Sequence, residues 1–146
     1  MLMDAINFST LKVLVIDDET YIRRVVTQLL RRLEVTYIVE AVEGKAGFME
    51  VVRNRPDVVL CDINMKPVDG MTFLSILRKT SNLDIAKTPV IFLTADSQQE
   101  TVVRAAKLHV NGYLVKPVSL NDLKKRITAA LAPPAPAQAE ETALEE

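Results

Sequence analysis

The chain has 146 residues, 49% of them hydrophobic and 25% charged, a composition typical of one soluble globular domain. Its formal net charge of −1 gives no reason to expect nucleic acid or a membrane surface as a partner. The single cysteine, Cys61, excludes an intrachain disulfide. No stretch approaches the roughly 18 apolar residues of a membrane span, and the start lacks the pattern of a signal peptide. We therefore expect a cytoplasmic protein.

The first half of the chain alternates between strand and helix patterns. Residues 12–16 are rich in β-branched side chains, which predicts a strand, and apolar residues at helical spacing predict a helix over 21–33. Asp18, between the two, is a natural N-cap for that helix. A second strand is predicted at 36–41 and a second helix at 43–54.

The second half continues this alternation. An uncharged run that ends on an acid, residues 58–62, predicts a buried third strand. Five strand–helix repeats with right-handed crossovers predict an α/β fold, in which a doubly wound, five-stranded parallel sheet of flavodoxin-like order 2-1-3-4-5 is covered by five helices. The remaining elements are a helix at 70–78, a polar connection at 80–88, a strand at 90–93, a helix at 102–108, a strand at 113–115 and a helix at 120–131.

Three segments follow from the composition. Residues 1–11 are predicted to be a leader, residues 12–132 the domain, and residues 133–146 a disordered tail rich in Pro, Ala and Glu. The tail holds four Glu and no Lys or Arg. Because four of the 19 acidic residues lie there, the remaining chain has 18 Lys and Arg against 15 Asp and Glu.

Polar side chains follow four of the predicted strands. Asp17 and Asp18 follow the first, Asp62 ends the third, Thr94 follows the fourth and Lys116 follows the fifth. Because the carboxyl ends of parallel strands share one edge of a sheet, these side chains should converge. Carboxylate oxygens without nearby His or Cys suit Mg²⁺, and a metal, an ammonium group and a hydroxyl around an acid suit a phosphoryl group. Each residue taken alone could have a purely structural role. Asp18, for example, could simply cap a helix.

Five motifs at these positions resemble, in order and spacing, the receiver domain of bacterial two-component response regulators, over about residues 11–131. The resemblance implies that Asp62 accepts a phosphoryl group from the histidine of a sensor kinase or of a histidine phosphotransfer protein. The motifs are Val15-Ile16-Asp17-Asp18-Glu19, Leu60-Cys61-Asp62-Ile63-Asn64-Met65, Asp69-Gly70, Leu93-Thr94-Ala95 and Tyr113-Leu114-Val115-Lys116-Pro117.

The resemblance also implies roles for the residues around the phosphoacceptor. Asp18 and Asp62 would bind Mg²⁺ directly, together with the main-chain carbonyl of Asn64, and Asp17 would act mostly through water. Lys116 would hold a phosphoryl oxygen. The metal site would therefore combine residues from two strand ends.

A switch is implied as well. Thr94 would move toward the phosphoryl group, and Tyr113 would turn inward into the vacated space. This change would repack the surface made by the helix at 102–108, the strand at 113–115 and the helix at 120–131, which is the usual output face. The local change of charge would thus bias an element with two arrangements.

Four further positions carry expectations. Asn64 and Asp96 would flank the path of an attacking water and tune the lifetime of the phosphoryl group. The bond from Lys116 to Pro117 would be cis. His109 stands where a glycine often ends the preceding helix, and a left-handed backbone is expected there.

These features predict a stand-alone response regulator, a signalling switch that catalyses only its own phosphorylation and autodephosphorylation. Too few residues follow position 132 for an output domain, so direct DNA binding is not expected. The alternative is a phosphotransfer intermediate or phosphate sink without a dedicated output partner. A receiver-like module that works unphosphorylated is disfavoured by the intact set of acids, and a flavin site by an acidic turn that would repel phosphate.

Overall fold

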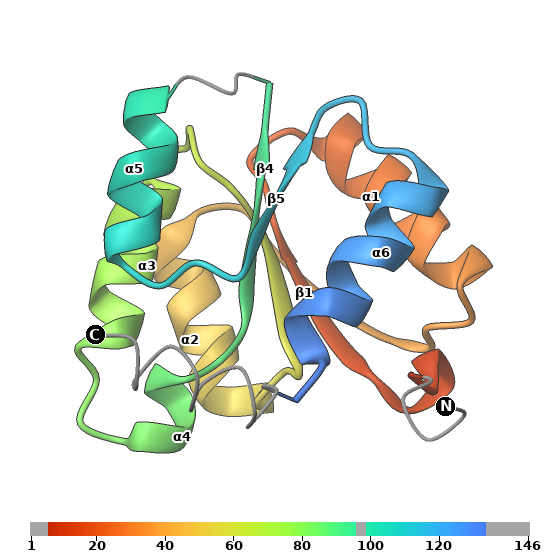
Figure 1. The fold of residues 1–146 in the computed structure, drawn as a ribbon, viewed down its shortest axis with the longest axis horizontal. Helices are drawn as coiled ribbons and strands as arrows, with labels where there is room; N and C mark the ends of the chain where they lie inside the picture. Colours follow the sequence, from red (N-terminus) through yellow and green to blue (C-terminus); the bar gives the residue numbers. More distant parts are fainter. Residues whose placement is uncertain (1–5, 96–98, 134–146) are drawn as a thin grey trace, which may run out of the picture.

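The computed structural model describes residues 6–95 and 99–133 and contains one parallel sheet (Figure 1). The strand order is β2-β1-β3-β4-β5, which confirms the predicted flavodoxin-like order. All five predicted strands are present, and their boundaries agree with the prediction to within one residue. The strands are β1 (Lys12–Ile16), β2 (Tyr37–Ala41), β3 (Val58–Asp62), β4 (Val90–Thr94) and β5 (Gly112–Val115).

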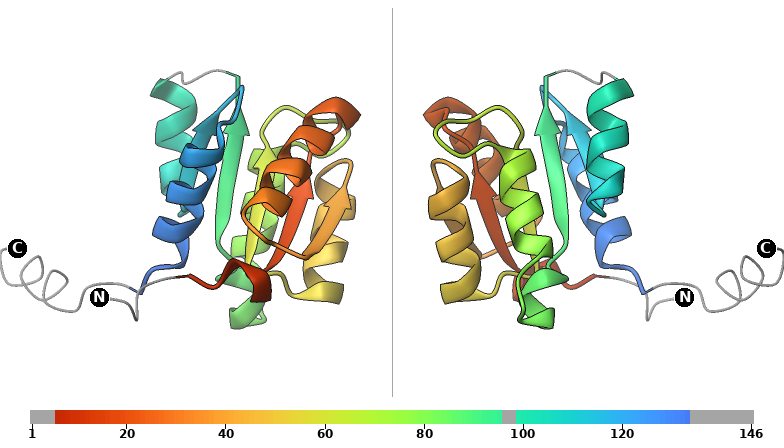
Figure 2. Two further views of the ribbon diagram at one scale, coloured as in Figure 1. Left: turned by 90° about the vertical axis from the view of Figure 1, so that its right-hand side faces the viewer. Right: turned by 90° about the vertical axis from the view of Figure 1, so that its left-hand side faces the viewer.

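Six α-helices are present within the described residues, five of them between strands and α6 after the last strand. Helices α1 and α6 cover one face of the sheet, and α2, α3 and α5 cover the other (Figures 1 and 2). No helix in the described part of the chain is long and apolar enough to cross a membrane. The helices are α1 (Thr20–Arg32), α2 (Gly44–Asn54), α3 (Gly70–Arg78), α4 (Leu83–Ala86), α5 (Gln99–Lys107) and α6 (Leu120–Leu131).

The alternation of side chains along β1 divides the core into two layers. Leu14 and Ile16 point into the cluster under α2, α3 and α5, whereas Val13 and Val15 join the cluster under α1 and α6. The central strands β3 and β4 are buried along their whole length. Strands covered on both faces are built from apolar residues, and here only Asp62 at the end of β3 is charged, which explains why both runs are easily recognised in the sequence.

One helix was not predicted. The segment 80–88, expected to be a polar connection, contains the single turn α4, so the described residues form six α-helices where five were expected. The Asn82 side chain accepts hydrogen bonds from the main-chain N–H groups of Asp84 and Ile85, and Ile85 is buried. Four residues are too few to display a helical repeat of apolar positions.

The predicted N-cap of α1 is wrong. Helix α1 begins at Thr20, and Glu19 occupies the N-cap position without a side-chain capping bond. The main-chain N–H of Glu19 instead donates to Asp17 Oδ1 at 2.9 Å. The exposed Asp18 side chain therefore does not cap α1, and the alternative that Asp18 serves only as a helix cap is excluded.

The guanidinium group of Arg78, at the end of α3, joins the segments that lead into β4 and β5. It donates five hydrogen bonds, which uses all of its N–H groups, and it is partly buried. Burial lowers the pKa of Arg78 from its ordinary value. The acceptors are the carbonyl oxygens of Leu108 (3.2 Å), Ala86 (2.8 Å), Thr88 (2.7 Å) and His109 (2.9 Å) and the side-chain oxygen of Asn111 (3.0 Å).

Candidate functional site

Asp62 lies where the buried strand β3 reaches the carboxyl edge of the sheet. Its side chain is almost fully buried, and the residue pairs in register with Leu93 of β4. The N–H of Ile63 donates to the carbonyl oxygen of Leu93, which holds the chain in place just after the acid. The apolar strand thus delivers one carboxylate into a pocket with little access to water.

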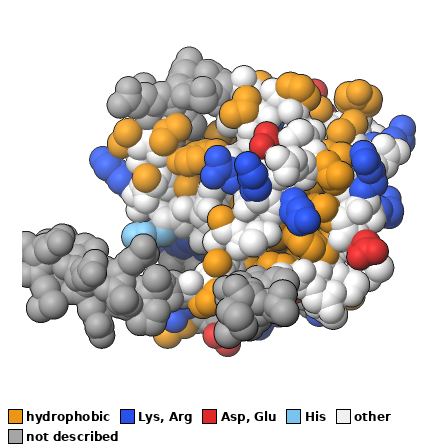
Figure 3. All heavy atoms as spheres, turned by 45° about the vertical axis from the view of Figure 1, so that its right-hand side comes forward, with side chains coloured by type: hydrophobic (Ala, Val, Ile, Leu, Met, Phe, Trp, Pro, Cys, Tyr) orange, Lys and Arg blue, Asp and Glu red, His pale blue; other side chains and the backbone are white. Residues whose placement is uncertain are grey.

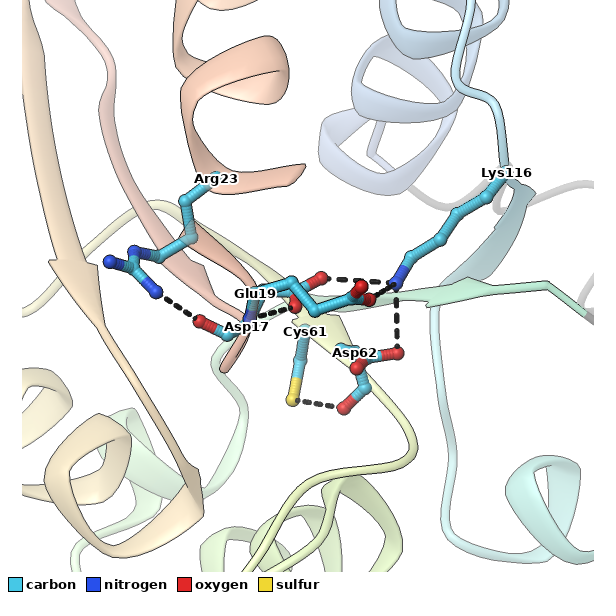
Figure 4. Close-up of polar contacts among 6 residues, drawn as sticks. All are labelled: Asp17, Glu19, Arg23, Cys61, Asp62 and Lys116. Atoms are coloured by element: carbon cyan, nitrogen blue, oxygen red, sulfur yellow. Dashed lines mark hydrogen bonds and ion pairs between the residues drawn. The ribbon is translucent and has the colours of Figure 1, made fainter. Parts of the chain in front are cut away.

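Asp17, directly after β1, lies beside Asp62 and is completely buried. Its N–H donates to the carbonyl oxygen of Ala41 at 3.1 Å, and its own carbonyl accepts a bond of 2.7 Å from the Arg23 guanidinium (Figure 4). Together with the bond from the N–H of Glu19, these contacts fix the orientation of the Asp17 carboxylate. The role of Arg23 was not predicted, because a helical arginine gives no sign in the sequence that it turns back toward the preceding strand.

Lys116 brings a positive charge from the end of β5 to these acids. Its Nζ lies 3.1 Å from Asp17 Oδ2, 3.3 Å from Asp62 Oδ1 and 3.7 Å from Glu19 Oε1 (Figure 4). The Lys116 N–H donates to the carbonyl oxygen of Thr94, which ties the lysine to the end of β4. The predicted convergence of strand ends is thus observed for Asp17, Asp62 and Lys116.

The charged groups in this pocket shift one another's pKa values. Burial raises the pKa of Asp62, the charge of Asp17 raises it further, and Lys116 and the N–H of Asn64 oppose this only in part. For Lys116, burial disfavours the charged form, but the carboxylates of Asp62 and Asp17 outweigh it and raise the pKa. The lysine is therefore held as a cation next to two acids that repel each other.

Carboxylate oxygens from four residues come together at this edge. Asp17, Asp18, Glu19 and Asp62 each offer an oxygen, and these atoms lie within 4.8 Å of one another. An all-oxygen set of this kind fits Mg²⁺, which takes hard oxygen ligands. Glu19 was missed as a possible ligand, although its place next to the two aspartates was a usable signal.

A cavity of about 350 Å³ opens beside these acids. Asp18 and the exposed Asn64, two of the four predicted metal-site residues, line it. The bond between Lys66 and Pro67, in the same loop, is cis, and so is the bond between Lys116 and Pro117, as predicted. The other lining residues are Met65, Lys66 and Asp69.

Thr94 and Tyr113 lie on the neighbouring strands β4 and β5. Thr94 is buried at the end of β4 and pairs in register with Val115. The Tyr113 ring lies 6.5 Å from that of Phe92, and its hydroxyl donates to the carbonyl oxygen of Val102 in α5 at 2.9 Å. Tyr113 thus links the sheet to α5.

Predictions were also made for His109 and Asp96, and the structure describes only His109. His109 has a left-handed backbone with φ of 60°, just after α5, which confirms the expectation for that helix end. Asp96 lies outside the described residues, as do residues 134–146 of the tail.

Cys61, next to the phosphoacceptor candidate, is completely buried, and its Sγ donates to the carbonyl oxygen of Asp62 at 3.2 Å.

The fold and the site define a flavodoxin-like α/β protein with a lysine-bridged acidic pocket at the carboxyl edge of its sheet. A family model described as the response regulator receiver domain matches residues 13–128. The chain belongs to the response regulator receiver family, whose members are signalling switches that accept a phosphoryl group in two-component signalling.

Named relatives agree with this assignment. Chemotaxis protein CheY-3 of Vibrio cholerae serotype O1 is 33% identical over 125 residues, which cover 86% of this chain and 95% of that protein. The structure of chemotaxis response regulator CheY4 of Vibrio cholerae has a TM-score of 0.74 at 27% identity, covering 83% of this chain and 98% of that one. A chain of the CheX–CheY–BeF₃–Mg complex from Borrelia burgdorferi has a TM-score of 0.75 at 23% identity, covers 84% and 90% of the two chains, and shows the same fold.

Proposed function

We propose that Asp62 is the phosphoacceptor of a stand-alone response regulator, with a sensor histidine kinase or a histidine phosphotransfer protein as donor. The observation that carries this proposal is the position of Lys116 Nζ, within 3.3 Å of the Asp62 carboxylate in a buried pocket. An oxygen of Asp62 bonds to phosphorus as the bond from phosphorus to the donor nitrogen breaks, which leaves an acyl phosphate. Lys116 then faces the charge that gathers on the phosphoryl oxygens.

The acidic cluster supports Mg²⁺ as the cofactor of this reaction. Asp17, Asp18, Asp62 and the Asn64 carbonyl would hold it, and Glu19 is near enough to contribute. When bound, Mg²⁺ supplies positive charge that offsets the repulsion between the carboxylates and the incoming phosphoryl group. The acids of the chain would position and orient this charge. The relative crystallised with BeF₃ and Mg has the same fold, which is consistent with this proposal.

The output is proposed to use Thr94 and Tyr113. The hydroxyl bond from Tyr113 to Val102 connects β5 with α5, so a turn of the Tyr113 ring would break a contact that holds α5 in its present place. The face formed by α5, β5 and α6 would then bind a protein partner. Val103 of α5 is 46% exposed and Val115 of β5 is 54% exposed, so both elements offer an apolar side chain to such a partner.

Other assignments of the sequence stay predictions. They are the division into a leader of residues 1–11, a receiver unit of residues 12–132 and a tail of residues 133–146, the tuning of phosphoryl lifetime by Asn64 and Asp96, and the cytoplasmic location. A partner that is neither a histidine kinase nor a histidine phosphotransfer protein, and that binds only after phosphorylation, would distinguish the output function from a pure phosphate relay.

The phosphoacceptor is tested by incubation with acetyl phosphate and Mg²⁺, followed by mass spectrometry. One acid-stable, base-labile phosphoryl group should be added, and Asp62→Asn should abolish it. Asp84→Asn, which changes an exposed acid on α4, is the matched control and should label like the unmodified protein. Labelling that survives in Asp62→Asn, or that needs no divalent metal, would contradict the proposal.

A further inference from the structure

Helix α1 presents an excess of positive charge that the acidic pocket does not use. Its thirteen residues include four arginines and no acid. Arg23 pairs with Glu40 at 3.0 Å, but Arg24, Arg31 and Arg32 take part in none of the ion pairs formed among the described residues. These three arginines therefore keep their charge exposed on the outer side of the helix.

Two of these arginines, Arg24 and Arg31, border a hollow with polar walls. A cavity of about 360 Å³ lies along α1, next to the edge strand β2. Arg24 and Arg31 are seven residues apart, two helical turns, and so lie on the same side of the helix. Figure 3, which views the side of α1 and α6, shows Lys and Arg side chains spread over this surface with few acids between them. The cavity is lined by Thr20, Arg23, Arg24, Thr27, Arg31 and Glu40.

The tail has the complementary charge. It carries Glu140, Glu141, Glu145 and Glu146 and no Lys or Arg. Such a segment, placed on a surface with unpaired arginines, gains from charge attraction without the burial of an unpaired charge.

The connection of the tail to α6 brings it within reach of α1. Helix α6 ends at Leu131 and packs beside α1, and because both helices follow parallel strands, the two C-terminal ends lie at the same end of the sheet (Figures 1 and 2). From Pro133 to Glu140 an extended chain spans up to about 24 Å. Helix α1, with thirteen residues, is about 20 Å long. The first pair of glutamates can therefore reach the arginines.

We propose that the glutamates of the tail bind in cis to the arginine face of α1, defined as Arg24, Arg31 and Arg32. The attachment to α6 supplies a high effective concentration, so weak surface ion pairs are sufficient for partial occupancy. Salt screens such pairs, and the contact is therefore released as ionic strength rises. The tail acts as an internal competitor that an acidic partner surface must displace from α1.

Amide chemical shifts of the full chain provide the test. The unmodified protein is compared with a variant in which all four tail glutamates are replaced by glutamine, at about 0.02 M and about 0.5 M salt. We expect shift differences over residues 24–32 at low salt and their loss at high salt. Shift differences confined to the tail and the last turn of α6 would overturn the proposal.

Variants of the arginines identify the surface that the tail contacts. The double variant Arg24→Gln, Arg31→Gln should remove the salt-dependent shifts of the tail, whereas Arg53→Gln, which removes an exposed charge from α2, should leave them unchanged. Both variants alter exposed side chains, and the dispersion of the amide spectrum confirms that each is folded. A dilution series distinguishes one chain from two: shifts that disappear on dilution would show binding between two copies and would contradict docking in cis.

Discussion

A Cβ atom added at Gly70 would lie 2.5 Å from the main-chain carbonyl oxygen of Asp62. Real Cβ atoms essentially never come that close, so the first turn of α3 packs against the end of β3 only because residue 70 is a glycine. The N–H of Gly70 also donates to the carbonyl oxygen of Ile63 at 2.8 Å. The position of Asp62, the proposed phosphoacceptor, therefore depends on a residue without a side chain.

Gly70→Ala should push α3 away from the end of β3. We expect a loss of about 1–3 kcal/mol in the free energy of unfolding, measured with urea, and slower phosphorylation by acetyl phosphate. Gly112→Ala is the control, because its added Cβ would meet no atom closer than 3.8 Å. Equal effects of the two substitutions would show that the close approach at Gly70 has no special importance.

The raised pKa of Asp62 predicts a pH-dependent effect of Asp62→Asn. Burial and the charge of Asp17 raise the pKa above its ordinary value of 3.8, so the folded protein binds a proton more tightly than the unfolded chain. The free energy of unfolding therefore falls as pH rises from 3.8 through the folded-state pKa. Without divalent metal, Asp62→Asn should be more stable than the unmodified protein at pH 7, and this gain should shrink on acidification to about pH 4.

Thermal unfolding across this pH range measures the effect. Mg²⁺ should stabilise the unmodified protein more than Asp62→Asn, because the variant has lost one carboxylate and with it part of the repulsion. Asp84→Asn should follow the unmodified protein throughout. A variant less stable than the unmodified protein at neutral pH would mean that the ion pair with Lys116 outweighs burial and the charge of Asp17.

Arg78→Ala should be among the most destabilising substitutions of a partly exposed residue in this chain. It removes the arginine donor from four main-chain carbonyls and from Asn111 Oδ1, which keeps only the bond from the N–H of Val90, and we expect a loss of roughly 3 kcal/mol. Arg78→Lys should recover only part of this loss, because an ammonium group has three donors. Arg53→Ala, at an exposed ion pair on α2, should change stability by less than about 0.5 kcal/mol in the same urea titration.

Tyr113→Phe isolates the hydroxyl bond to Val102. Its removal should cost about 1 kcal/mol of stability while the extent of labelling by acetyl phosphate stays unchanged. Tyr37→Phe is the matched control, because the Tyr37 hydroxyl donates to Asn54 at the surface at 3.2 Å, and a smaller loss is expected. Loss of labelling in Tyr113→Phe would show that the substitution disturbs the fold and not only the link to α5.

The sheet could be predicted almost completely from the sequence, because its central strands are buried on both faces and, apart from Asp62 at the end of β3, contain no charged residue. Asp17, Asp62 and Lys116 could be placed together because parallel strands end at a common edge. The turn of α4 and the start of α1 could not be located, since both depend on which oxygen accepts a particular N–H. Contacts of long, flexible side chains, such as those made by Arg23, follow from packing and leave no periodic pattern.

The depth of Cys61 in the sheet gives the protein an internal reporter. Its thiol is fully covered, and burial together with the charge of Asp62 raises its pKa, so alkylating reagents find neither access nor thiolate in the folded state. Alkylation of Cys61 therefore requires β3 to separate from its neighbouring strands, and the rate of alkylation reports how often this opening occurs. Because the reporter lies one residue before Asp62, alkylation followed with and without Mg²⁺ or acetyl phosphate would show how tightly each closes the centre of the sheet.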